Sequence, residues 1–472
     1  MIAFPDIERS FLGSYPGYRD TAILDKLRTT DYERLDRLGE VYLDYTGASL
    51  YAGTQIQEHM QILLANVFGN PHSTNSASTS ATRALERARN AVHEFFNASA
   101  KEYVVVFTQN ASGALKLIGE SYPFDHASRL LLAFDNHNSV NGIREFARAV
   151  GARLTYTPLV LPDMRLDKDA LSSHLSSDTG SSNQLFAYPA QSNFSGVCHS
   201  LEWIELAHAH GWDVVLDAAA YIATNKLDLS EIKPDFVSIS FYKMFGYPTG
   251  TGCLIARKAA VSKLRRPWFS GGTITVASVK GDRHYLHKGP EAFEDGTPNY
   301  LSCPAIEIGL RHIARVGYNV IHSRVEALTG WSLDQLAALR HDNGRSMVKI
   351  YGPLTTDARG GTIALNFFDV DGRFIDHQVV EERANSMKIS LRTGCFCNPG
   401  GGESALGISA DELSVCFSGT PSHMTLEDFR QCIDDKSTGA VRISFGLVSN
   451  FADAYRFVRF AHRFINKRAS EI

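Results

Sequence analysis

The sequence predicts a doubly wound α/β domain followed by a smaller α+β domain. From about Tyr103 to Ala256, short apolar runs rich in β-forming residues alternate with helical patterns. The runs are almost continuously apolar, which is typical of strands that helices cover on both faces of a parallel or mixed sheet. After about Ile308 this alternation stops, and a long helical stretch leads into a different order of elements. The first pattern predicts one sheet with helices on both sides.

Seven runs are expected to be the strands of the main sheet. They are YVVVF (Tyr103–Phe107), LLLAF (Leu130–Phe134), RLTYTPLV (Arg153–Val160), QLFAYPA (Gln184–Ala190), WDVVLDA (Trp212–Ala218), DFVSISF (Asp235–Phe241) and GCLIA (Gly252–Ala256). The helical patterns are exemplified by Thr82–Phe96, in which Leu85, Ala88, Val92 and Phe95 are spaced by three and four residues.

The second part of the chain is expected to begin with helical residues Gly309–Leu339. Three strand-like runs and a helix follow: Thr362–Phe368, Met387–Gly394, Val441–Gly446 and Phe451–Ile465. We therefore expect a larger domain over residues 40–308. The smaller domain is expected to combine residues 1–39 with residues 309–472.

Composition and charge exclude several classes of protein. A chain of 472 residues, 44% hydrophobic and 21% charged, fits a globular protein of two or three domains. A formal net charge of -4 gives no reason to expect nucleic acid or an anionic membrane as a partner. No apolar run approaches the ~18 residues of a membrane span, and the first residues do not resemble a signal peptide. The seven cysteines predict no disulfide framework, so we expect a cytoplasmic protein whose cysteines are mostly buried.

Two neighbouring strands end on polar residues that a cofactor could use. Asp217 closes one apolar run, and Lys243 follows the next, ahead of the glycine-rich turn GYPTGTG. Ligands of such sheets bind beyond the carboxyl ends of the strands, so the two side chains are expected to share a site. Pyridoxal phosphate (PLP) needs a lysine for its Schiff base and an acid for its pyridinium nitrogen. A surface lysine and a helix-capping aspartate explain the pair less well, because a carboxylate at the end of an apolar strand needs a partner.

Three further strand ends carry candidate residues. Ala111 and Ser112 open a helix after the first strand, where backbone N–H groups could hold a phosphate. His137 follows the second strand, where its ring could stack on a cofactor and exchange protons near neutral pH. Asn193 follows the fourth and could donate to the phenolic oxygen of the cofactor. The alternatives are that Ala111 and Ser112 open an ordinary capped helix, that His137 is structural, and that Asn193 is a turn residue.

The segment SLRTGCFCNPGGG (Ser390–Gly402) carries two cysteines and a run of glycines. A zinc site needs about four ligands, and no second cluster of matching spacing exists, so no metal is predicted. A redox dithiol usually shows C-x-x-C rather than C-x-C. A nucleophilic thiol on a flexible loop fits best. Arg442, in GAVRISFG, could bind a carboxylate with its planar guanidinium or be salt-bridged in a strand, and the residues alone leave this open.

Together these segments resemble the class V aminotransferase-like group of PLP enzymes of fold type I. Within it the chain is most similar to cysteine desulfurases, and above all to the desulfurase part of eukaryotic molybdenum cofactor sulfurases. The resemblance rests on segments spread over nearly the whole chain: Tyr42–Tyr51, Phe68–Ser73, Asp135–Val140, Leu216–Tyr221, Ser238–Gly252, Phe293–Leu301, Leu391–Gly400 and Thr438–Gly446.

The resemblance implies a large domain with a mostly parallel seven-stranded sheet and a role for each candidate residue. Lys243 would be the Schiff-base lysine, Asp217 the pyridinium partner, His137 the stacked acid and base, and Asn193 the neighbour of the phenolic oxygen. Ala111, Ser112, Ser240 and Tyr242 would surround the phosphate, and Thr273 would reach the phosphate of a partner subunit, which implies a homodimer. Arg442 and Ala48 would bind the substrate, and Cys397 would carry a persulfide.

The implied reaction converts L-cysteine to L-alanine and passes sulfur from Cys397 to an acceptor, either a protein or a small molecule. Two positions depart from the commoner desulfurases, which have histidine at Tyr242 and glutamine at Ala220. The chain also ends where molybdenum cofactor sulfurases continue into a further domain, so the acceptor stays open. One alternative is a PLP-dependent C–S or C–Se lyase, or another class V enzyme, acting on a different amino acid. A non-catalytic scaffold or zinc-binding module is the other.

Overall fold

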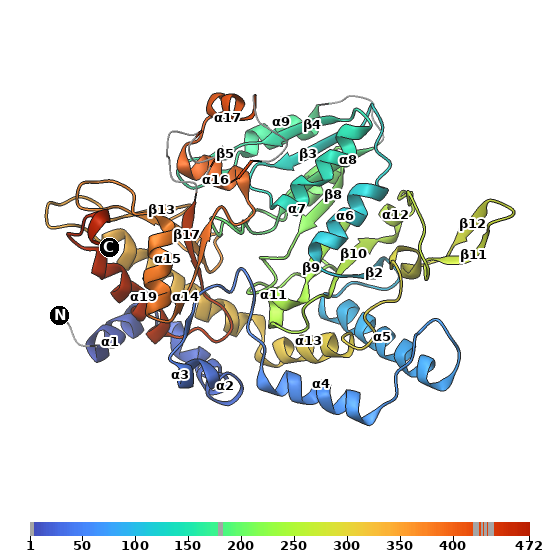
Figure 1. The fold of residues 1–472 in the computed structure, drawn as a ribbon, viewed down its shortest axis with the longest axis horizontal. Coiled ribbons are helices and arrows are strands. Elements are labelled where there is room, and N and C mark those ends of the chain that lie inside the picture. Colours follow the sequence, from blue (N-terminus) through green and yellow to red (C-terminus); the bar gives the residue numbers. More distant parts are fainter. Residues whose placement is uncertain (1–3, 178–182, 419–423, 426–427, 429–431, 433–438) are drawn as a thin grey trace.

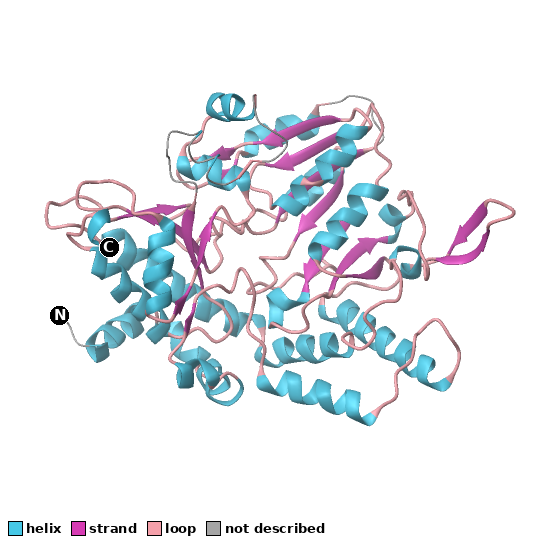
Figure 2. Ribbon diagram, in the orientation of Figure 1, coloured by secondary structure: helices cyan, strands magenta, loops and turns pink. Residues whose placement is uncertain are grey.

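The computed structural model describes residues 4–177, 183–418, 424–425, 428, 432 and 439–472. Its main sheet has seven strands (Figures 1 and 2). In spatial order they are β2 (Tyr103–Thr108), β10 (Gly252–Arg257), β9 (Phe236–Ser240), β8 (Asp213–Asp217), β7 (Gln184–Pro189), β3 (Arg129–Ala133) and β4 (Arg153–Thr157). Only β10 runs antiparallel to its neighbours. The predicted α/β fold with a mostly parallel seven-stranded sheet is confirmed.

Side chains that alternate along the strands contribute to two hydrophobic cores, one on each face of the sheet. Val106, Leu130 and Leu132 face one side, where α6 (Ala111–Ser121) and α8 (Ile143–Ala149) pack. Val105 and Leu131 face the other, which α5 (Ser76–Phe95), α10 (Trp203–Ala209) and α13 (Pro304–Val316) cover. Successive residues of a strand point to opposite faces, so apolar residues at every position follow from burial on both sides.

Two sequence-based boundaries differ from the structure. The run Arg153–Val160 was predicted as one strand, but Pro158 divides it, since proline cannot donate to a ladder. The residues beyond it form β5 (Leu159–Val160), which pairs with β6 (Arg165–Leu166). The helix predicted from Thr82 begins earlier, at Ser76, because the side chain of Asn75 accepts a hydrogen bond from the Ser78 N–H and caps it.

A second sheet of four antiparallel strands lies beside the first (Figure 1, left). Its order is β13 (Val348–Tyr351), β14 (Thr362–Phe367), β17 (Ala440–Ser444) and β16 (Arg392–Gly394). The helices α14 (Tyr318–Ala338), α15 (His377–Ser386) and α19 (Phe451–Ala461) belong to this part. The short strands β1 (Val41–Tyr42) and β15 (Ile389–Ser390) pair in parallel.

The remaining elements are mostly short. The helices are α1 (Phe4–Ser14), α2 (Ile23–Asp31), α3 (Arg34–Leu38), α4 (Gly53–Ala65), α7 (Asn138–Asn141), α9 (Lys168–Ser176), α11 (Phe241–Phe245), α12 (Lys258–Val261), α16 (Pro399–Leu406) and α17 (Ala410–Phe417). The 3-10 helices are η1 (Pro16–Thr21), η2 (Pro290–Phe293), η3 (His462–Phe464) and η4 (Ala469–Glu471). A hairpin of β11 (Ile274–Ser278) and β12 (Arg283–Leu286) projects from the body (Figure 1). No described helix is both long and apolar enough to span a bilayer.

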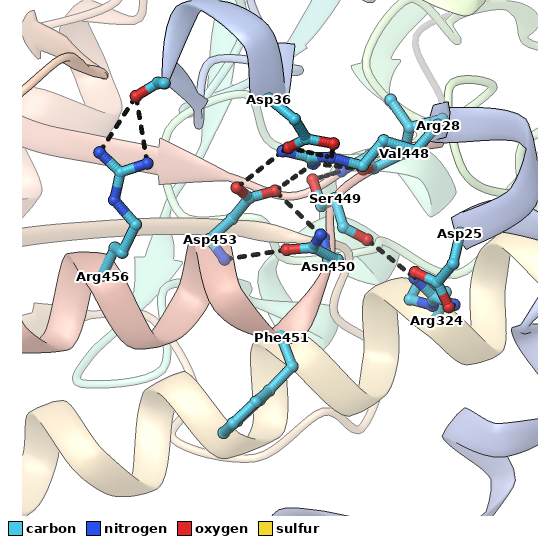
Figure 3. Close-up of polar contacts among 12 residues, drawn as sticks. Asp25, Arg28, Asp36, Arg324, Val448, Ser449, Asn450, Phe451, Asp453 and Arg456 are labelled. Carbon is cyan, nitrogen blue, oxygen red and sulfur yellow. Dashed lines mark hydrogen bonds and ion pairs between the residues drawn. The ribbon is translucent and has the colours of Figure 1, made fainter. Parts of the chain in front are cut away.

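Ion pairs of two buried arginines hold the helices α2 and α3 against α14 and α19 (Figure 3). The guanidinium of Arg28, in α2, donates to Asp36, to the Val448 carbonyl and to Asp453 of α19, the last at 2.6 Å. Arg324 of α14 is fully buried and donates to both oxygens of Asp25 at 2.8 Å. The N-terminal residues thus contact helices of the predicted smaller domain. The domain boundaries themselves stay a prediction.

We expect Arg28→Met to lower the free energy of unfolding by about 3–5 kcal/mol, because it leaves the buried Asp453 carboxylate without its cation. Burial raises the pKa of Asp453, and Arg28 opposes that rise. In the variant, protonating Asp453 removes the unpaired charge, so the loss should shrink as the pH falls. Urea unfolding at two pH values measures both effects. A loss below 1 kcal/mol, or one that grows in acid, would contradict this account.

The cysteines include one disulfide pair. Cys416 and Cys432 are joined by a disulfide, which the expectation of no disulfide framework did not foresee. A count argues only against a framework of several bridges, and it does not exclude a single pair 16 residues apart. Of the other cysteines, Cys253 and Cys303 are buried as expected, but Cys395 and Cys397 are exposed.

Candidate active site

A cavity of ≈ 130 Å³ lies beyond the carboxyl ends of the parallel strands. Eight of the predicted site residues line it: Ala111, Ser112, His137, Asn193, Asp217, Ser240, Tyr242 and Lys243. Ala48, Thr273, Cys397 and Arg442 are not among its lining residues. The strand order therefore brings together the residues predicted for one cofactor, as the topology of such sheets requires.

Asp217 ends β8 and keeps one carboxylate oxygen available. Its Oδ1 accepts hydrogen bonds from the Ser238 hydroxyl, on the neighbouring strand, and from the Ala219 N–H, both at 3.1 Å. Its Oδ2 makes no hydrogen bond to any described residue. These bonds fix the orientation of the buried carboxylate and leave Oδ2 to accept from a protonated ligand atom. Ser238 was missed in the sequence, although it lies two residues before Ser240.

Lys243 lies in α11, the short helix that follows β9. Burial lowers the pKa of Lys243, and the cations Arg442 and Arg392 lower it further, whereas Asp217 and Asp44 raise it. The Nζ atom makes no hydrogen bond with the described part of the chain. A lysine whose charged form is disfavoured holds more free amine near neutral pH, which is the form that attacks a carbonyl.

The amino end of α6 meets the end of β9 at the cavity. The Ala111 N–H donates to the Ser240 hydroxyl at 2.8 Å, and the Ser112 and Ser139 hydroxyls share a hydrogen bond of 2.6 Å. Gly252 permits this approach, since a Cβ at that position would lie 2.7 Å from the Asn110 Cα. Hydroxyls and N–H groups at a helix amino end form a suitable site for a phosphate.

His137 is positioned by the turn that begins α7. Its Nδ1 accepts a hydrogen bond from the Ser139 N–H at 3.1 Å, so in the neutral ring the proton is on Nε2. Burial lowers the pKa of His137; Lys243 and Arg442 also lower it, and Asp217 raises it. The ring is therefore mostly neutral at neutral pH and has an Nε2–H to donate.

Asn193 turns towards the cysteine segment. Its Nδ2 donates to the Phe396 carbonyl at 2.7 Å, and its Oδ1 accepts from Asn398 at 2.9 Å. The bond predicted to a cofactor oxygen stays a prediction. The contact with Phe396 was not visible in the sequence, because the two residues are 203 positions apart.

The glycines after Cys397 lie in a helix and not in the loop that the sequence predicted; the mobility of the Cys397 segment stays a prediction. Gly400, Gly401 and Gly402 lie in the first turn of α16, which Asn398 caps by accepting from the Gly401 N–H at 2.9 Å. The Asn138 N–H, next to His137, donates to the Cys397 carbonyl at 2.7 Å. The backbone of the exposed Cys397 therefore contacts the segment that follows β3 and contains His137, although Cys397 and His137 are distant in sequence.

Arg442, buried in β17, shares one carboxylate with a second arginine. It lies directly opposite Arg392 of β16, a pairing of like charges that is destabilising without compensation. Asp44 supplies the compensation: its Oδ1 accepts from Arg442 at 2.9 Å and its Oδ2 accepts from Arg392 at 2.7 Å. Asp44 and Arg392 were not singled out in the sequence, although both lie in segments that carry the family resemblance.

Ala48 connects this arginine pair to the cavity. It lies in the turn after Asp44, and its N–H donates to the Asp44 carbonyl at 3.1 Å. The next residue, Ser49, donates its hydroxyl to the Lys243 carbonyl at 2.8 Å and its N–H to the Tyr242 carbonyl. The predicted substrate residues Ala48 and Arg442 therefore lie beside the predicted cofactor residues, outside the cavity itself.

Thr273 is the predicted residue that does not join the others. It is buried, and its hydroxyl donates to the Ser270 carbonyl at 2.9 Å and accepts from the Ser270 N–H. It directly precedes the projecting hairpin (Figure 1), and it does not line the cavity of its own chain. Its predicted action on a partner subunit stays a prediction. Among the described residues, no three histidine, cysteine, aspartate or glutamate side chains gather as metal ligands.

Comparison with known proteins places this geometry in a family. The family model "Aminotransferase class-V" matches residues 41–457. The chain is 38% identical over 480 residues to the molybdenum cofactor sulfurase of Solanum lycopersicum, covering 95% of this chain and 58% of that protein. It is 36% identical to the same-named protein of Homo sapiens, covering 97% of this chain and 52% of that protein. The chain thus spans little more than half the length of these relatives.

Two solved structures share the fold. A cysteine desulfurase from Thermococcus onnurineus NA1 has a TM-score of 0.76 at 23% identity, covering 93% of this chain and 98% of that one. The cysteine desulfurase CsdA from Escherichia coli has a TM-score of 0.73 at 20% identity over the same shares. At these identities the likeness concerns the fold alone. With the family model spanning residues 41–457, the chain belongs to the aminotransferase class-V family.

Proposed function

We propose that this chain is a PLP-dependent cysteine desulfurase, which converts L-cysteine to L-alanine and holds the released sulfur as a persulfide on Cys397. The observation that carries the proposal is the meeting of Lys243, Asp217 and His137 in one cavity, next to the exposed Cys397. The relatives named molybdenum cofactor sulfurase and the fold neighbours named cysteine desulfurase support it.

The side chains that line the cavity suit the chemical groups of PLP. The free Oδ2 of Asp217 suits a protonated ring nitrogen, and the unbonded Nζ of Lys243 suits the aldehyde carbon. The hydroxyls of Ser240 and Ser112 lie at the amino end of α6, where a phosphate would bind, and Tyr242 also lines the cavity. When bound, PLP supplies the electron sink that makes the α-proton of an amino acid removable.

Each residue of the site would then have a separate role in the reaction. Arg442 would bind the α-carboxylate of L-cysteine, and the Lys243 amine would remove and return the α-proton. The Cys397 thiolate would attack the substrate sulfur, so that the new S–S bond forms as the C–S bond breaks. The bond electrons pass to the β-carbon, which takes up a proton and becomes the methyl group of alanine. The Nε2–H of His137 is placed to donate a proton within the same site.

The sulfur acceptor, the oligomeric state and the cellular location are also inferred. We infer that the persulfide is passed to a protein or small-molecule acceptor; the names of the relatives make the molybdenum cofactor one candidate. We infer a homodimer, because the hairpin region exposes large apolar side chains such as Trp268, Val276 and Val279 that a second copy could cover. We infer a cytoplasmic protein, because five of the seven cysteines are free and the proposed reaction needs a reduced thiol, although a disulfide such as Cys416–Cys432 is unusual in that compartment.

The decisive test is the mass of the peptide that contains Cys397 after incubation with L-cysteine. The proposal requires alanine in the solution and one added sulfur atom on this peptide, removed by a thiol reductant. Pyruvate and free sulfide without the adduct would point instead to a lyase. L-Serine, which lacks the sulfur, serves as the control and should leave the peptide unchanged.

Arg442→Lys is expected to raise the KM for L-cysteine by about 10–100-fold, because the bidentate partner of the carboxylate is lost. Cysteamine, which has no carboxylate, is the matched control substrate, and its slower conversion should be the same in both proteins. Steady-state kinetics with the two substrates measure the difference. An equal loss with both would show that Arg442 does not bind the carboxylate.

A further inference from the structure

We propose that Asn398 is the positioning residue for the Cys397 thiol, and that its side chain ties the cysteine segment to the two strand ends that build the cavity. The inference rests on the proposed function, since it assigns a task within sulfur transfer. It starts from the backbone of the cysteine segment, which adopts an unusual conformation.

Phe396 and Cys397 both have left-handed backbone angles, with φ of 58° and 55°. In the described part of the chain, no other two adjacent non-glycine residues share a positive φ. The left-handed region costs residues with a side chain roughly 1–2 kcal/mol each. Such a conformation persists only where the surrounding structure enforces it.

Contacts from outside the segment hold both residues. The Phe396 carbonyl accepts from the Asn193 side chain, and the Cys397 carbonyl accepts from the Asn138 N–H, each at 2.7 Å. The Phe396 ring packs against Phe194 at a centroid distance of 5.3 Å, and the Arg442 guanidinium lies 4.6 Å from its centre. The backbone that carries the Cys397 thiol is therefore held by residues at the strand ends and by Arg442.

Asn398 joins these supports to one another. It is fully buried, and its Nδ2 donates to the Asp135 carbonyl at 2.7 Å and to Asn193 Oδ1 at 2.9 Å. Its Oδ1 accepts from the Gly401 N–H. Because a carbonyl such as that of Asp135 can only accept, the orientation of the amide is fixed, and both of its donors and its oxygen have partners. We define Asn398, Asn193 and the Asp135 carbonyl as the asparagine clasp.

The clasp links the thiol to the cofactor side of the site. Asp135 lies two residues before His137, and its carboxylate is itself anchored by the buried His199 at 3.0 Å. Sulfur transfer requires the thiol to be aligned with the substrate sulfur, and a shift of about 1 Å in a reacting group can cost 10²-fold in rate. Removal of the α-proton uses Lys243 and does not involve the thiol. Loss of the asparagine clasp should therefore slow sulfur transfer and leave the removal of the α-proton unchanged.

Asn398→Ser separates the clasp from helix capping. Serine is as good an N-cap as asparagine, so α16 keeps its cap, but both donors to the clasp are lost. Asn450→Ser is the matched control, because Asn450 caps α19 in the same way and does not line the cavity. Three quantities are measured in each protein loaded with PLP: alanine formation, exchange of the L-cysteine α-proton with deuterated water, and amide hydrogen exchange of residues 393–406.

We expect Asn398→Ser to lower alanine formation by about 10–100-fold while α-proton exchange and the KM stay within about twofold of the parent values. Amide exchange of residues 393–406 should become faster. Asn450→Ser should change none of these quantities. Asn398→Asp retains the cap but places a carboxylate oxygen against the Asp135 carbonyl and Asn193 Oδ1, which are both acceptors. It should therefore lower alanine formation at least as much as Asn398→Ser.

Two results would overturn the inference. Alanine formation within twofold of the parent would show that the clasp does not position the thiol. An equal loss of alanine formation and α-proton exchange would show a general structural role. Failure of the proposed function is a separate outcome: if the parent makes no alanine from L-cysteine, the clasp is judged by amide exchange alone, and unchanged exchange in Asn398→Ser would refute it.

Discussion

Replacing Lys243 with alanine is expected to abolish turnover of L-cysteine, with a loss of at least about 10⁴-fold, because one amine would serve both as covalent anchor and as base. Burial lowers the pKa of Lys243, so the change removes a poised free amine rather than an ordinary surface charge. The absorption near ~410–430 nm that lysine-bound PLP gives should disappear as well. Alanine release and the absorption spectrum after incubation with PLP measure the two effects.

The matched control is Lys226→Ala. Lys226 is exposed and pairs with Asp228 at 2.8 Å, so its loss should leave both the spectrum and turnover unchanged. An Lys243→Ala protein that kept the absorption band would place the covalent anchor elsewhere. If neither the parent nor the variant showed the band, the non-catalytic scaffold would become the better interpretation.

The cofactor half of the site could be predicted because one rule connects local sequence to position. Apolar strands that run parallel end at the same edge of their sheet, so Asp217, Lys243 and His137 had to converge once each strand had been recognised. The register of β8 beside β9, which sets Asp217 opposite Ser238, needed the structure. It depends on side-chain packing across the sheet, and the individual runs do not encode it.

The substrate half depends on contacts that no local pattern contains. Asp44 meets Arg442 across 398 positions and Arg392 across 348. Three short segments must fold together before the shared carboxylate exists. The glycine run after Cys397 lies in a helix, where the sequence predicted a loop, for a different reason. Asn398 followed by Pro399 is the signal for a helix cap and first helical residue, and it outweighs the preference of glycine for loops.

Replacing Cys397 with serine should separate the two halves of the reaction. We expect alanine formation to fall by at least about 10³-fold and the sulfur adduct to vanish, since the hydroxyl of serine is a far weaker nucleophile than a thiolate. Exchange of the substrate α-proton should continue, because it depends on Lys243. Alanine assay, peptide mass and proton exchange by NMR measure the three outcomes.

Cys395→Ser is the matched control, since Cys395 is also exposed and lies two residues away. The conformation of the segment distinguishes the two thiols. Cys397 has the left-handed backbone and its carbonyl is held by the residue after His137, whereas Cys395 has neither feature. Activity should therefore survive in Cys395→Ser. If Cys395→Ser were the inactive variant, the sulfur would pass through the other thiol, and if neither substitution slowed alanine formation, the enzyme would be a lyase that needs no cysteine of its own. An intact α-proton exchange in Cys397→Ser, set beside its loss in Lys243→Ala, would show that the sheet end activates the substrate and the cysteine segment removes its sulfur.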